Sequence, residues 1–408
     1  MSCESNSRNA TPPAPAVAPG VELIDPAEAA RAHRTDPRLA SLVPGFDAPF
    51  FQAGLAGYSD AAMRLIARRH GCPCCVTEAL LDRSLLSGGR GFDKADLGDI
   101  ADNVPGGDED FPLVGQIMGS DPGEMAAAAV KMIEQGARPP KHYRLLAHQP
   151  VPSPQTPDPS VAPRTFSAID INLACPVRKI SAKARGGHWL REPEGAIDIL
   201  RAVRAAVPES IPVTVKLRRG SDDSPQAERN FYRIFDALFD LGCAWTTVHG
   251  RTVEQKYVGP SRWTFLRDLV RARPGRLVFG SGDVWEVRDI FRMLAYTGVQ
   301  AVSVARGCIG NPWIFRQARA MMDGAPPAPP TLDEQRAVLR EHFDLSVAVN
   351  GEGGASLMMR KFGVRFAAHH PRAEEVRRRF IAVESIDGWR RVLDEEYAPA
   401  VPEPALLT

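Results

Sequence analysis

Short apolar segments rich in β-branched residues alternate with longer amphipathic segments along most of the chain. The first kind predicts buried strands, and apolar residues at helical spacing predict helices that cover them. Eight strands are predicted at Phe50–Gly54, Cys74–Glu78, Pro112–Met118, Ala168–Asn172, Pro212–Leu217, Ala244–Val248, Arg276–Gly280 and Val299–Val304. Helices follow most of these strands, for example Asp121–Gln135, Glu192–Ala206, Ala227–Asp240 and Val284–Tyr296.

This alternation predicts an α/β fold with a parallel sheet. Eight strand–helix units in about 280 residues match a closed (β/α)8 barrel, or TIM barrel. An open, doubly wound sheet is the alternative. It is less favoured because about six strands would suffice for it and no Gly-x-Gly-x-x-Gly motif follows the first strand.

The strand pattern stops after residue 330, and a small all-helical domain is predicted from helices at Asp333–Val349, Gly354–His369 and Ala373–Glu384. We expect a disordered N-terminal tail at residues 1–36 and the barrel at 37–322. A proline-rich linker at 323–330 precedes the helical domain at 331–400. Residues 137–165 hold eight prolines in 29 positions, which predicts an insertion on the barrel face opposite the active site.

Composition narrows the class of protein. The 408 residues are 44% hydrophobic, as in a globular protein, and 50 basic residues against 49 acidic ones give a net charge of +1. No global field therefore draws the molecule to nucleic acid or membrane, and any RNA affinity must be local. The seven irregularly spaced cysteines, with no signal peptide and no membrane span, predict a cytoplasmic protein without membrane contact, which we expect to be a monomer.

Polar and glycine residues follow the predicted strands, at the end of a barrel where active sites lie. These positions are Gly54–Gly57, Glu78, Gln116, Asn172–Pro176, Lys216–Arg218, His249–Arg251, Gly280–Asp283 and Ala305–Gly307. The last two strands end in glycine-rich turns that open helices, where backbone N–H groups hold phosphate, and Arg306 can add a bidentate contact. A phosphate-bearing cofactor or substrate is predicted.

Each of these residues also has a structural interpretation. Glycine turns join strands to helices in any barrel, Lys216 could extend between helices to solvent, and His249 could be a hydrogen-bonded core histidine. Their coincidence at the strand ends favours a site.

Cys175 is the sharpest candidate for catalysis. Pro176 follows it and disfavours helix at the cysteine, which leaves it in an extended or turn conformation after the fourth strand. A thiol is mostly protonated at neutral pH, so it can act as a general acid as well as a nucleophile. The alternative is an inert, small apolar side chain.

The other cysteines predict no metal site. Cys72, Cys74 and Cys75 have no Cys or His pair at matching spacing to complete four ligands, so buried, reduced thiols are expected. Cys243 and Cys308 are interpreted as packing residues.

A local excess of positive charge lies between Met358 and Phe380. Seven basic residues against Glu374 and Glu375 give a net charge of +5; they are Arg360, Lys361, Arg365, Arg372, Arg377, Arg378 and Arg379. Such a patch fits phosphate backbones, and a solvated helix face is the alternative.

From Phe50 to Glu384 the chain resembles the flavin-dependent tRNA-dihydrouridine synthases. The matching motifs, in order, are Ala53-Gly-Leu-Ala-Gly-Tyr-Ser-Asp60, Gln116 in Val-Gly-Gln-Ile-Met-Gly-Ser-Asp, Ile169-Asp-Ile-Asn-Leu-Ala-Cys-Pro176, Val213-Thr-Val-Lys-Leu-Arg218, His249-Gly-Arg-Thr252, Gly282-Asp283, and Arg306 before Gly310-Asn-Pro-Trp-Ile-Phe315.

The resemblance implies FMN in the barrel mouth, NADPH as reductant and tRNA as partner. The implied cofactor-binding residues are Gly54, Leu55, Ala56, Gln116, Lys216, His249, Ser281, Gly282, Asp283, Ala305 and Arg306. Hydride would pass from reduced flavin to C6 of uracil, with Cys175 as the proton donor to C5. The implied substrate-binding residues are Asn172, Arg218, Arg360, Lys361, Arg377 and Arg378.

The chain departs from the family pattern at three places. Ala-Pro-Met at the first strand end is Ala-Gly-Leu here, Ser281 replaces an asparagine, and Ala305 replaces a glycine where backbone approaches phosphate. These departures are expected to weaken the affinity for the cofactor. Two other functions stay open: a flavin barrel acting on a small molecule, as in dihydroorotate-type oxidoreductases, and a non-catalytic RNA-binding descendant.

Overall fold

The computed structural model describes residues 20–87, 108–136 and 165–398. Its strands form one parallel sheet in the order β2-β1-β9-β8-β7-β6-β5-β4-β3, and an additional β2–β4 pairing closes it into a barrel. The strands are β1 Phe50–Gln52, β2 Cys75–Val76, β3 Leu80–Leu81, β4 Leu113–Met118, β5 Ala168–Asn172, β6 Val213–Arg218, β7 Trp245–His249, β8 Val278–Ser281 and β9 Ala301–Val304. The predicted (β/α)8 barrel is confirmed, and the open sheet is excluded.

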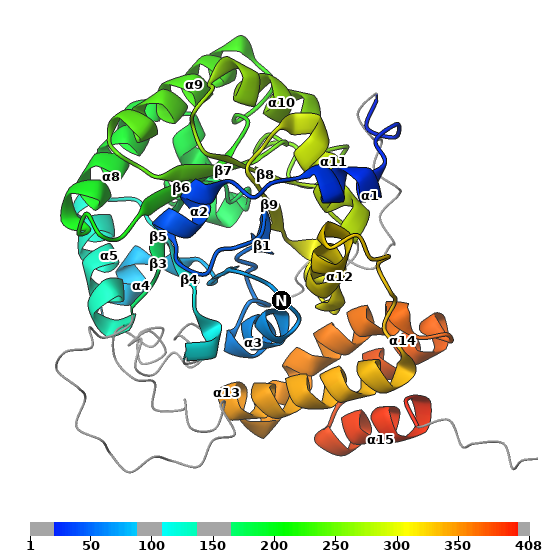
Figure 1. Cartoon of the computed structure of the whole chain (residues 1–408). Helices are drawn as coiled ribbons and strands as arrows, with labels where there is room; N and C mark the ends of the chain where they lie inside the picture. The colour runs from blue at the N-terminus through cyan, green and yellow to red at the C-terminus, as the bar shows by residue number, and fades with distance from the viewer. Residues whose placement is uncertain (1–19, 88–107, 137–164, 399–408) are drawn as a thin grey trace, which may run out of the picture.

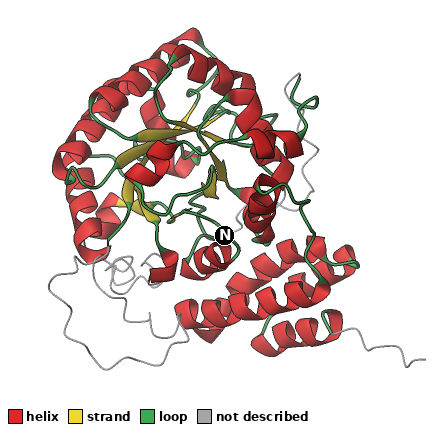
Figure 2. Cartoon of the chain, viewed as in Figure 1, coloured by secondary structure: helices red, strands yellow, loops and turns green. Residues whose placement is uncertain are grey.

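Helices surround the strands on the outside of the barrel (Figure 2). Those within or before the barrel are α1 Pro26–Ala32, α2 Pro37–Leu42, α3 Ala61–Arg69, α4 Asp82–Ser87, α5 Pro122–Gly136, α7 Arg178–Ser181, α8 Pro193–Ala206, α9 Pro225–Asp240, α10 Trp263–Ala272, α11 Val287–Thr297 and α12 Trp313–Met322. Helix α9 shows how the sequence sets them: Ser224 caps the N–H of Ala227, Pro225 occupies the first turn, and one face is apolar and buried.

The second predicted strand is divided in the structure. Both β2 and β3 pair with β4, at Cys75↔Leu113 and at Leu80↔Ile117. From the first pair to the second the chain advances five positions on the β2–β3 side and four on β4, so one extra residue breaks the ladder. At this break the Thr77 hydroxyl accepts a hydrogen bond from the backbone N–H of Gln116, at 3.0 Å.

Alternation along the strands divides the barrel interior into an apolar end and a polar end. The cluster that fills the interior toward the amino ends of the strands is apolar and includes Phe46, Phe51, Val114, Ala168, Trp245, Phe279 and Ala301. Toward the carboxyl ends, inward positions become polar. One cavity inside the barrel is lined by residues of the apolar cluster and by the polar residues Gln116, Asp170, Lys216, Thr247 and Ser303. The fold thus concentrates polar side chains at the face where barrel chemistry occurs.

Three helices follow the barrel: α13 Leu332–Phe366, α14 Ala373–Ile381 and α15 Ile386–Glu396. Figure 1 shows them, in orange to red, beside α3 and α12. Helix α13 is interrupted at Gly351, which has a φ of 69°, at the break predicted between two helices. Helix α15 was not predicted, although Ser385 caps it and its buried Trp389 and Val392 have helical spacing.

Aromatic contacts join these helices to the barrel. The ring of Phe362 meets Tyr58 edge-on at 5.6 Å between centroids, and Phe366 meets Trp313 in the same way at 5.5 Å. The interface between helix α13 and the barrel therefore contains packed aromatic side chains.

The N-terminal expectation needs correction. Residues 26–32 of the predicted disordered tail form α1, capped by Asp25, and Val21 and Ala30 are buried against the barrel core. A small apolar contact with α11 and α12 orders a segment whose composition favours disorder. Residues 1–19 and all of the predicted insertion except residue 165 lie outside the described part. The 323–330 linker has no regular structure after Gly324.

Candidate active site

The segment that carries Cys175 leaves the end of β5 and lies at the rim of the barrel. The Asn172 side-chain oxygen accepts a hydrogen bond from the N–H of Ala174 at 2.9 Å, and the Cys175 carbonyl accepts one from Gly187 at 3.0 Å. Its side chain is partly exposed. Burial raises the pKa of the Cys175 thiol, and the positive charges of Arg218 and Lys216 act in the opposite direction. The raised pKa favours a protonated thiol at neutral pH.

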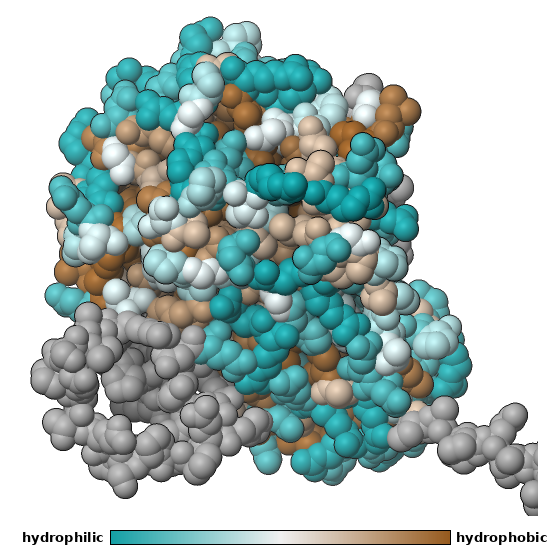
Figure 3. Space-filling view, viewed as in Figure 1, coloured by the Kyte–Doolittle hydropathy of each residue, from teal (hydrophilic) through white to brown (hydrophobic). Residues whose placement is uncertain are grey.

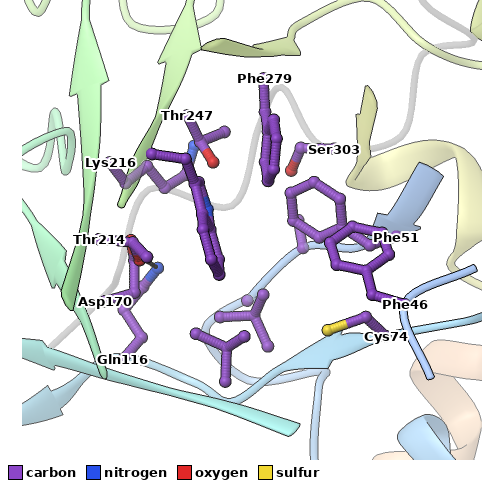
Figure 4. Close-up of a pocket in the computed structure, with 15 residues that line it drawn as sticks. Phe46, Phe51, Cys74, Gln116, Asp170, Thr214, Lys216, Thr247, Phe279 and Ser303 are labelled. Atoms are coloured by element: carbon purple, nitrogen blue, oxygen red, sulfur yellow. Dashed lines mark hydrogen bonds between the residues drawn. The ribbon is translucent and has the colours of Figure 1, made fainter. Parts of the chain in front are cut away.

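Lys216 points into the barrel, so it does not extend between helices to solvent. It is the register partner of Asn172 on β5 and of Thr247 on β7, and it lines the interior cavity (Figure 4). Burial, reinforced by Arg218, lowers the pKa of Lys216 to about 8, while Asp170 and Cys175 hold it up. The ammonium is therefore still mainly charged at pH 7.

Asp170 is a residue that the sequence analysis missed. It occupies the inward position two residues before Asn172 and is 5% exposed. Burial raises the pKa of its carboxyl, whereas hydrogen bonds from Thr214 and Gln116 and the charge of Lys216 lower it. The signal was available in Ile169-Asp-Ile-Asn172, since residues at i and i+2 share one face of a strand.

His249 ends β7 and is buried beneath the turn after β8. Its Nδ1 accepts a hydrogen bond from the backbone N–H of Arg251 at 3.3 Å. Burial, with the positive charges of Arg218, Lys216 and two further arginines, lowers the pKa of His249 well below its ordinary value. The ring is therefore neutral at pH 7 and offers a hydrogen bond at the rim rather than a charge.

The glycine turns after β8 and β9 have no room for side chains. A Cβ at Gly282, where φ is 109°, would lie 2.4 Å from the Ser261 hydroxyl, and one at Gly307 would lie 2.4 Å from the Val284 carbonyl oxygen. These positions therefore require glycine because neighbouring protein atoms fill the space that a side chain would take. Ser281, just before Gly282, is buried.

The Asp283 carboxylate is held by Arg251 and Ser261 and also lies 3.8 Å from Arg306 Nη2. Both of its oxygens lie 2.7 Å from Arg251 Nη2, and one also accepts a hydrogen bond from the N–H of Ser261. The arginine neutralises a carboxylate that would otherwise repel an anion at the turn. What Asp283 can offer a phosphate is its backbone, held at a φ of 56°.

Arg306 is held at the rim by two aromatic rings. Its guanidinium lies 4.3 Å from the Trp285 ring centroid and 5.0 Å from that of Tyr257. The side chain is 34% exposed, so the cation remains accessible beside the glycine turns. Ala305, which precedes it, is partly buried.

Arg218 joins two loops of the rim. Its guanidinium donates to the carbonyl of Ala174 at 2.8 Å and to those of Thr252 and Lys256 at 2.9 and 2.8 Å. It therefore holds the Cys175 segment against the loop that follows β7. Burial lowers the pKa of Arg218 to about 10, so it remains charged.

The first strand ends in a close backbone contact. A Cβ at Gly54 would lie 2.3 Å from the Thr77 carbonyl oxygen, so no side chain fits at this position. Leu55 is partly buried and Ala56 is exposed. The departure from the family's proline thus accompanies a backbone path that requires glycine here.

The basic segment of the helical domain is less positive than its sequence count. Arg377 lies 3.6 Å from Glu374, and Arg372 and Arg379 both pair with Glu396. The remaining predicted substrate-binding residues of this domain are Arg360, which is partly buried, and Lys361 and Arg378, which are exposed. The visible face of these helices is mainly hydrophilic (Figure 3).

The five other cysteines among the described residues are placed as expected. Cys72, Cys74, Cys75, Cys243 and Cys308 are buried and unpaired. Within the described residues, no cluster of His, Cys, Asp or Glu has an arrangement that could hold a metal ion. Across the same residues, no helix combines the length and apolar character needed to cross a bilayer.

These features define a (β/α)8-barrel protein with an enzyme-type site at the carboxyl ends of its strands: a rim thiol, a buried lysine, a neutral histidine and closely packed glycine turns. A family model described as "Dihydrouridine synthase (Dus)" matches residues 159–400. A Treponema pallidum protein described as a probable tRNA-dihydrouridine synthase is 32% identical over 78% of this chain and 84% of its own length. The chain belongs to the dihydrouridine synthase family.

Two further likenesses were found. A Mycobacterium leprae protein, also described as a probable tRNA-dihydrouridine synthase, is 36% identical over 54% of this chain. That alignment covers 57% of the mycobacterial protein, so this chain matches little more than half of its length. Among solved structures, an old yellow enzyme homologue from Zymomonas mobilis superposes with a TM-score of 0.41 and 15% identity, over 68% of this chain and 89% of that one. A score this low adds nothing to the fold assignment.

Proposed function

We propose that this protein is an FMN-dependent tRNA-dihydrouridine synthase that reduces the C5–C6 double bond of uridine in tRNA with NADPH. The observation that carries the proposal is the rim thiol of Cys175, kept protonated by burial within the electrostatic reach of Lys216 and Arg218. Family membership supports the reaction type.

The residues at the rim fit a flavin mononucleotide. The partly exposed Gly282 in the turn after β8 would offer its backbone to a phosphate, and the 34% exposed Arg306 would supply a cation beside it. Gln116, Lys216 and His249 would surround the flavin ring with Gly54, Leu55 and Ala56, and Ser281, Asp283 and Ala305 would line its phosphate end. When bound, FMN would supply the hydride for C6 of uracil, and NADPH would restore the reduced flavin.

Cys175 would complete the reaction. Addition of hydride to C6 places an electron pair at C5 and the C4 carbonyl, and the thiol donates a proton to C5. The sum is two electrons and two hydrogens added across the double bond, and the thiolate recovers its proton from solvent. Asn172 would hold the uracil. Lys216 would stabilise the negative charge of the reduced flavin ring, across the site from the uracil.

The helical domain favours tRNA over a small-molecule substrate. Arg360, Lys361, Arg377 and Arg378 would contact the phosphate backbone, and Arg218 would brace the rim around an unstacked base. A monomer in the cytoplasm, where its reductant and substrate are present, completes the proposal.

A direct assay tests this function. The purified protein, NADPH and an unmodified tRNA transcript should produce dihydrouridine, detected by nucleoside mass spectrometry, and the protein should carry a flavin spectrum. Cys175→Ala should keep the spectrum and lose about 100-fold or more in rate. Full activity of that variant would remove the proton-donor role. A protein that binds tRNA but no flavin would instead be an RNA-binding descendant.

A further inference from the structure

Three neighbouring strands place a hydrogen-bonded row of side chains inside the barrel. Gln116 on β4 pairs in register with Asp170 on β5, which pairs with Thr214 on β6. Gln116 Nε2 donates to one Asp170 oxygen at 2.7 Å, and the Thr214 hydroxyl donates to the other at 2.7 Å. Figure 4 shows the three side chains together on one wall of the cavity.

The row of hydrogen bonds continues toward the barrel rim, to the Cys175 segment. Asn172 Nδ2 donates to Gln116 Oε1 at 2.7 Å, and Asn172 Oδ1 accepts the N–H of Ala174 at 2.9 Å. Ala174 directly precedes Cys175. A continuous path of hydrogen bonds therefore runs from Asp170 to the backbone beside the thiol.

The chemistry of Asp170 fixes the direction of every bond in this path. An ionised carboxylate only accepts hydrogen bonds, whereas a side-chain amide has one accepting end and one donating end. Asp170 therefore requires Gln116 Nε2, which turns Gln116 Oε1 toward Asn172. Asn172 must then present Nδ2 to Gln116, which leaves its oxygen for Ala174. The reverse orientation of both amides would place acceptor against acceptor at Asp170 and donor against donor at the Ala174 N–H.

Water does not relieve this constraint. Asp170 is 5% exposed, Gln116 is 2% exposed and Thr214 is fully buried. A mismatched donor or acceptor among these three residues would lose its hydrogen bond without compensation from solvent, whereas Asn172, at the rim end of the row, is partly exposed.

We propose that Asp170 is a positioning residue that sets the orientation of Gln116 and Asn172 and, through them, the conformation of the Cys175 segment. The effect of Asp170 on catalysis rests on the proposed function, in which Cys175 donates the proton. The effect of Asp170 on the surroundings of the thiol is independent of the proposed function.

A pair of substitutions that reverses the row provides the test. Asn172→Asp alone places a carboxylate on each side of the Gln116 amide. Gln116 has one donating end, so only one of the two carboxylates can accept a hydrogen bond from it. Asp170→Asn alone keeps every bond, because the new amide accepts from Gln116 and the Thr214 hydroxyl rotates to accept from it. The double variant lets Gln116 turn round, so that each group again meets its complement.

The readout is the rate at which iodoacetamide alkylates the Cys175 thiolate in the purified protein, measured by peptide mass spectrometry and corrected in each variant for the thiolate fraction given by its own pH profile, so that the altered charge near the thiol does not enter. Asn172→Asp should speed alkylation about tenfold, the equivalent of one lost buried hydrogen bond, because the segment loosens. Asp170→Asn and the double variant should stay within about twofold of wild type. Thr214→Val, which touches only the far oxygen of Asp170, is the matched control and should also stay within about twofold.

Failure of the double variant to restore the wild-type rate would overturn the proposal. If Asn172→Asp does not fold, recovery of folding in the double variant supports it, and Gln116→Met, which breaks the row without adding charge, should still speed alkylation about tenfold. An unchanged rate in Gln116→Met contradicts it. Dihydrouridine formation, measured in parallel, tests the proposed function separately: an inactive wild type with intact rescue of alkylation defeats only that function.

Discussion

Gly186 lies directly against Cys175, and a Cβ at this glycine would be 2.7 Å from the Cys175 Cβ. The same atom would be 3.1 Å from the Met118 sulfur, and the φ of Gly186 is 56°. The neighbouring Gly187 donates its N–H to the Cys175 carbonyl. The position of the thiol thus depends on a glycine in a separate segment, the turn before α8.

Gly186→Ala should displace Cys175 and disturb the proton transfer. We expect a loss of about 1–3 kcal/mol in the free energy of unfolding, from overpacking and the left-handed backbone, and a larger fractional loss of dihydrouridine formation. Gly353→Ala is the matched control, because a Cβ there meets nothing within 4 Å. Urea unfolding and the tRNA assay measure both effects. Equal activity in the two variants would show that the contact does not matter.

The thiol of Cys175 should ionise at higher pH than an ordinary cysteine. Burial raises its pKa, so at pH 8 a smaller fraction is thiolate and alkylation should be slower than for a free cysteine peptide. Lys216→Met removes a positive charge that lowers the pKa of Cys175, and it should move the alkylation midpoint to still higher pH. A midpoint below that of the free peptide would contradict a protonated donor at neutral pH.

Hydrophobic patterning was sufficient to predict the barrel, because buried parallel strands and their covering helices differ in length and period. It did not predict the division between β2 and β3, since the extra residue around Thr77 is set by hydrogen bonding to β4. Helix α1 was missed because its stability depends on contacts with distant α11 and α12. The strand-end rule located the Cys175, Lys216 and His249 positions.

The rule did not predict which way each side chain faces. Asp283 was grouped with the phosphate-binding residues, yet its carboxylate is bound by Arg251. Arg218 was grouped with the substrate contacts, yet its guanidinium is occupied by backbone carbonyls of two loops. Partners this distant in sequence leave no local pattern, so only the three-dimensional structure identifies them.

Exposed cations of the helical domain should govern the salt dependence of tRNA binding. Lys361→Ala combined with Arg378→Ala should weaken binding and reduce the slope of log K against log salt by about 2, one for each lost phosphate contact. Arg201→Ala on α8, an exposed arginine paired with Asp198 on the barrel, is the control and should leave the slope unchanged. Filter binding at several salt concentrations measures it. Equal slopes in all three proteins would place the RNA on another surface.

His342 should make the protein less stable in mild acid. It is fully buried beside Gln52 without a hydrogen-bond partner among the described residues, and burial lowers its pKa to about 3. Between that value and about 6.5 only the unfolded chain takes up the proton, so stability falls as pH decreases.

From pH 7 to pH 5 this histidine should remove about 2 kcal/mol from the free energy of unfolding. His342→Leu should abolish that part of the slope in urea titrations at the two pH values. An identical slope in wild type and variant would mean that the imidazole is already solvated or paired.

The most direct test of the proposed reaction is nucleoside mapping of tRNA from cells that lack this gene, rescued by wild type or by Cys175→Ala. Dihydrouridine should disappear from at least one tRNA position in the deletion, return with the wild-type protein and stay absent with the variant. Unchanged dihydrouridine in the deletion, or full rescue by Cys175→Ala, would contradict the proposed function or its proton donor, respectively.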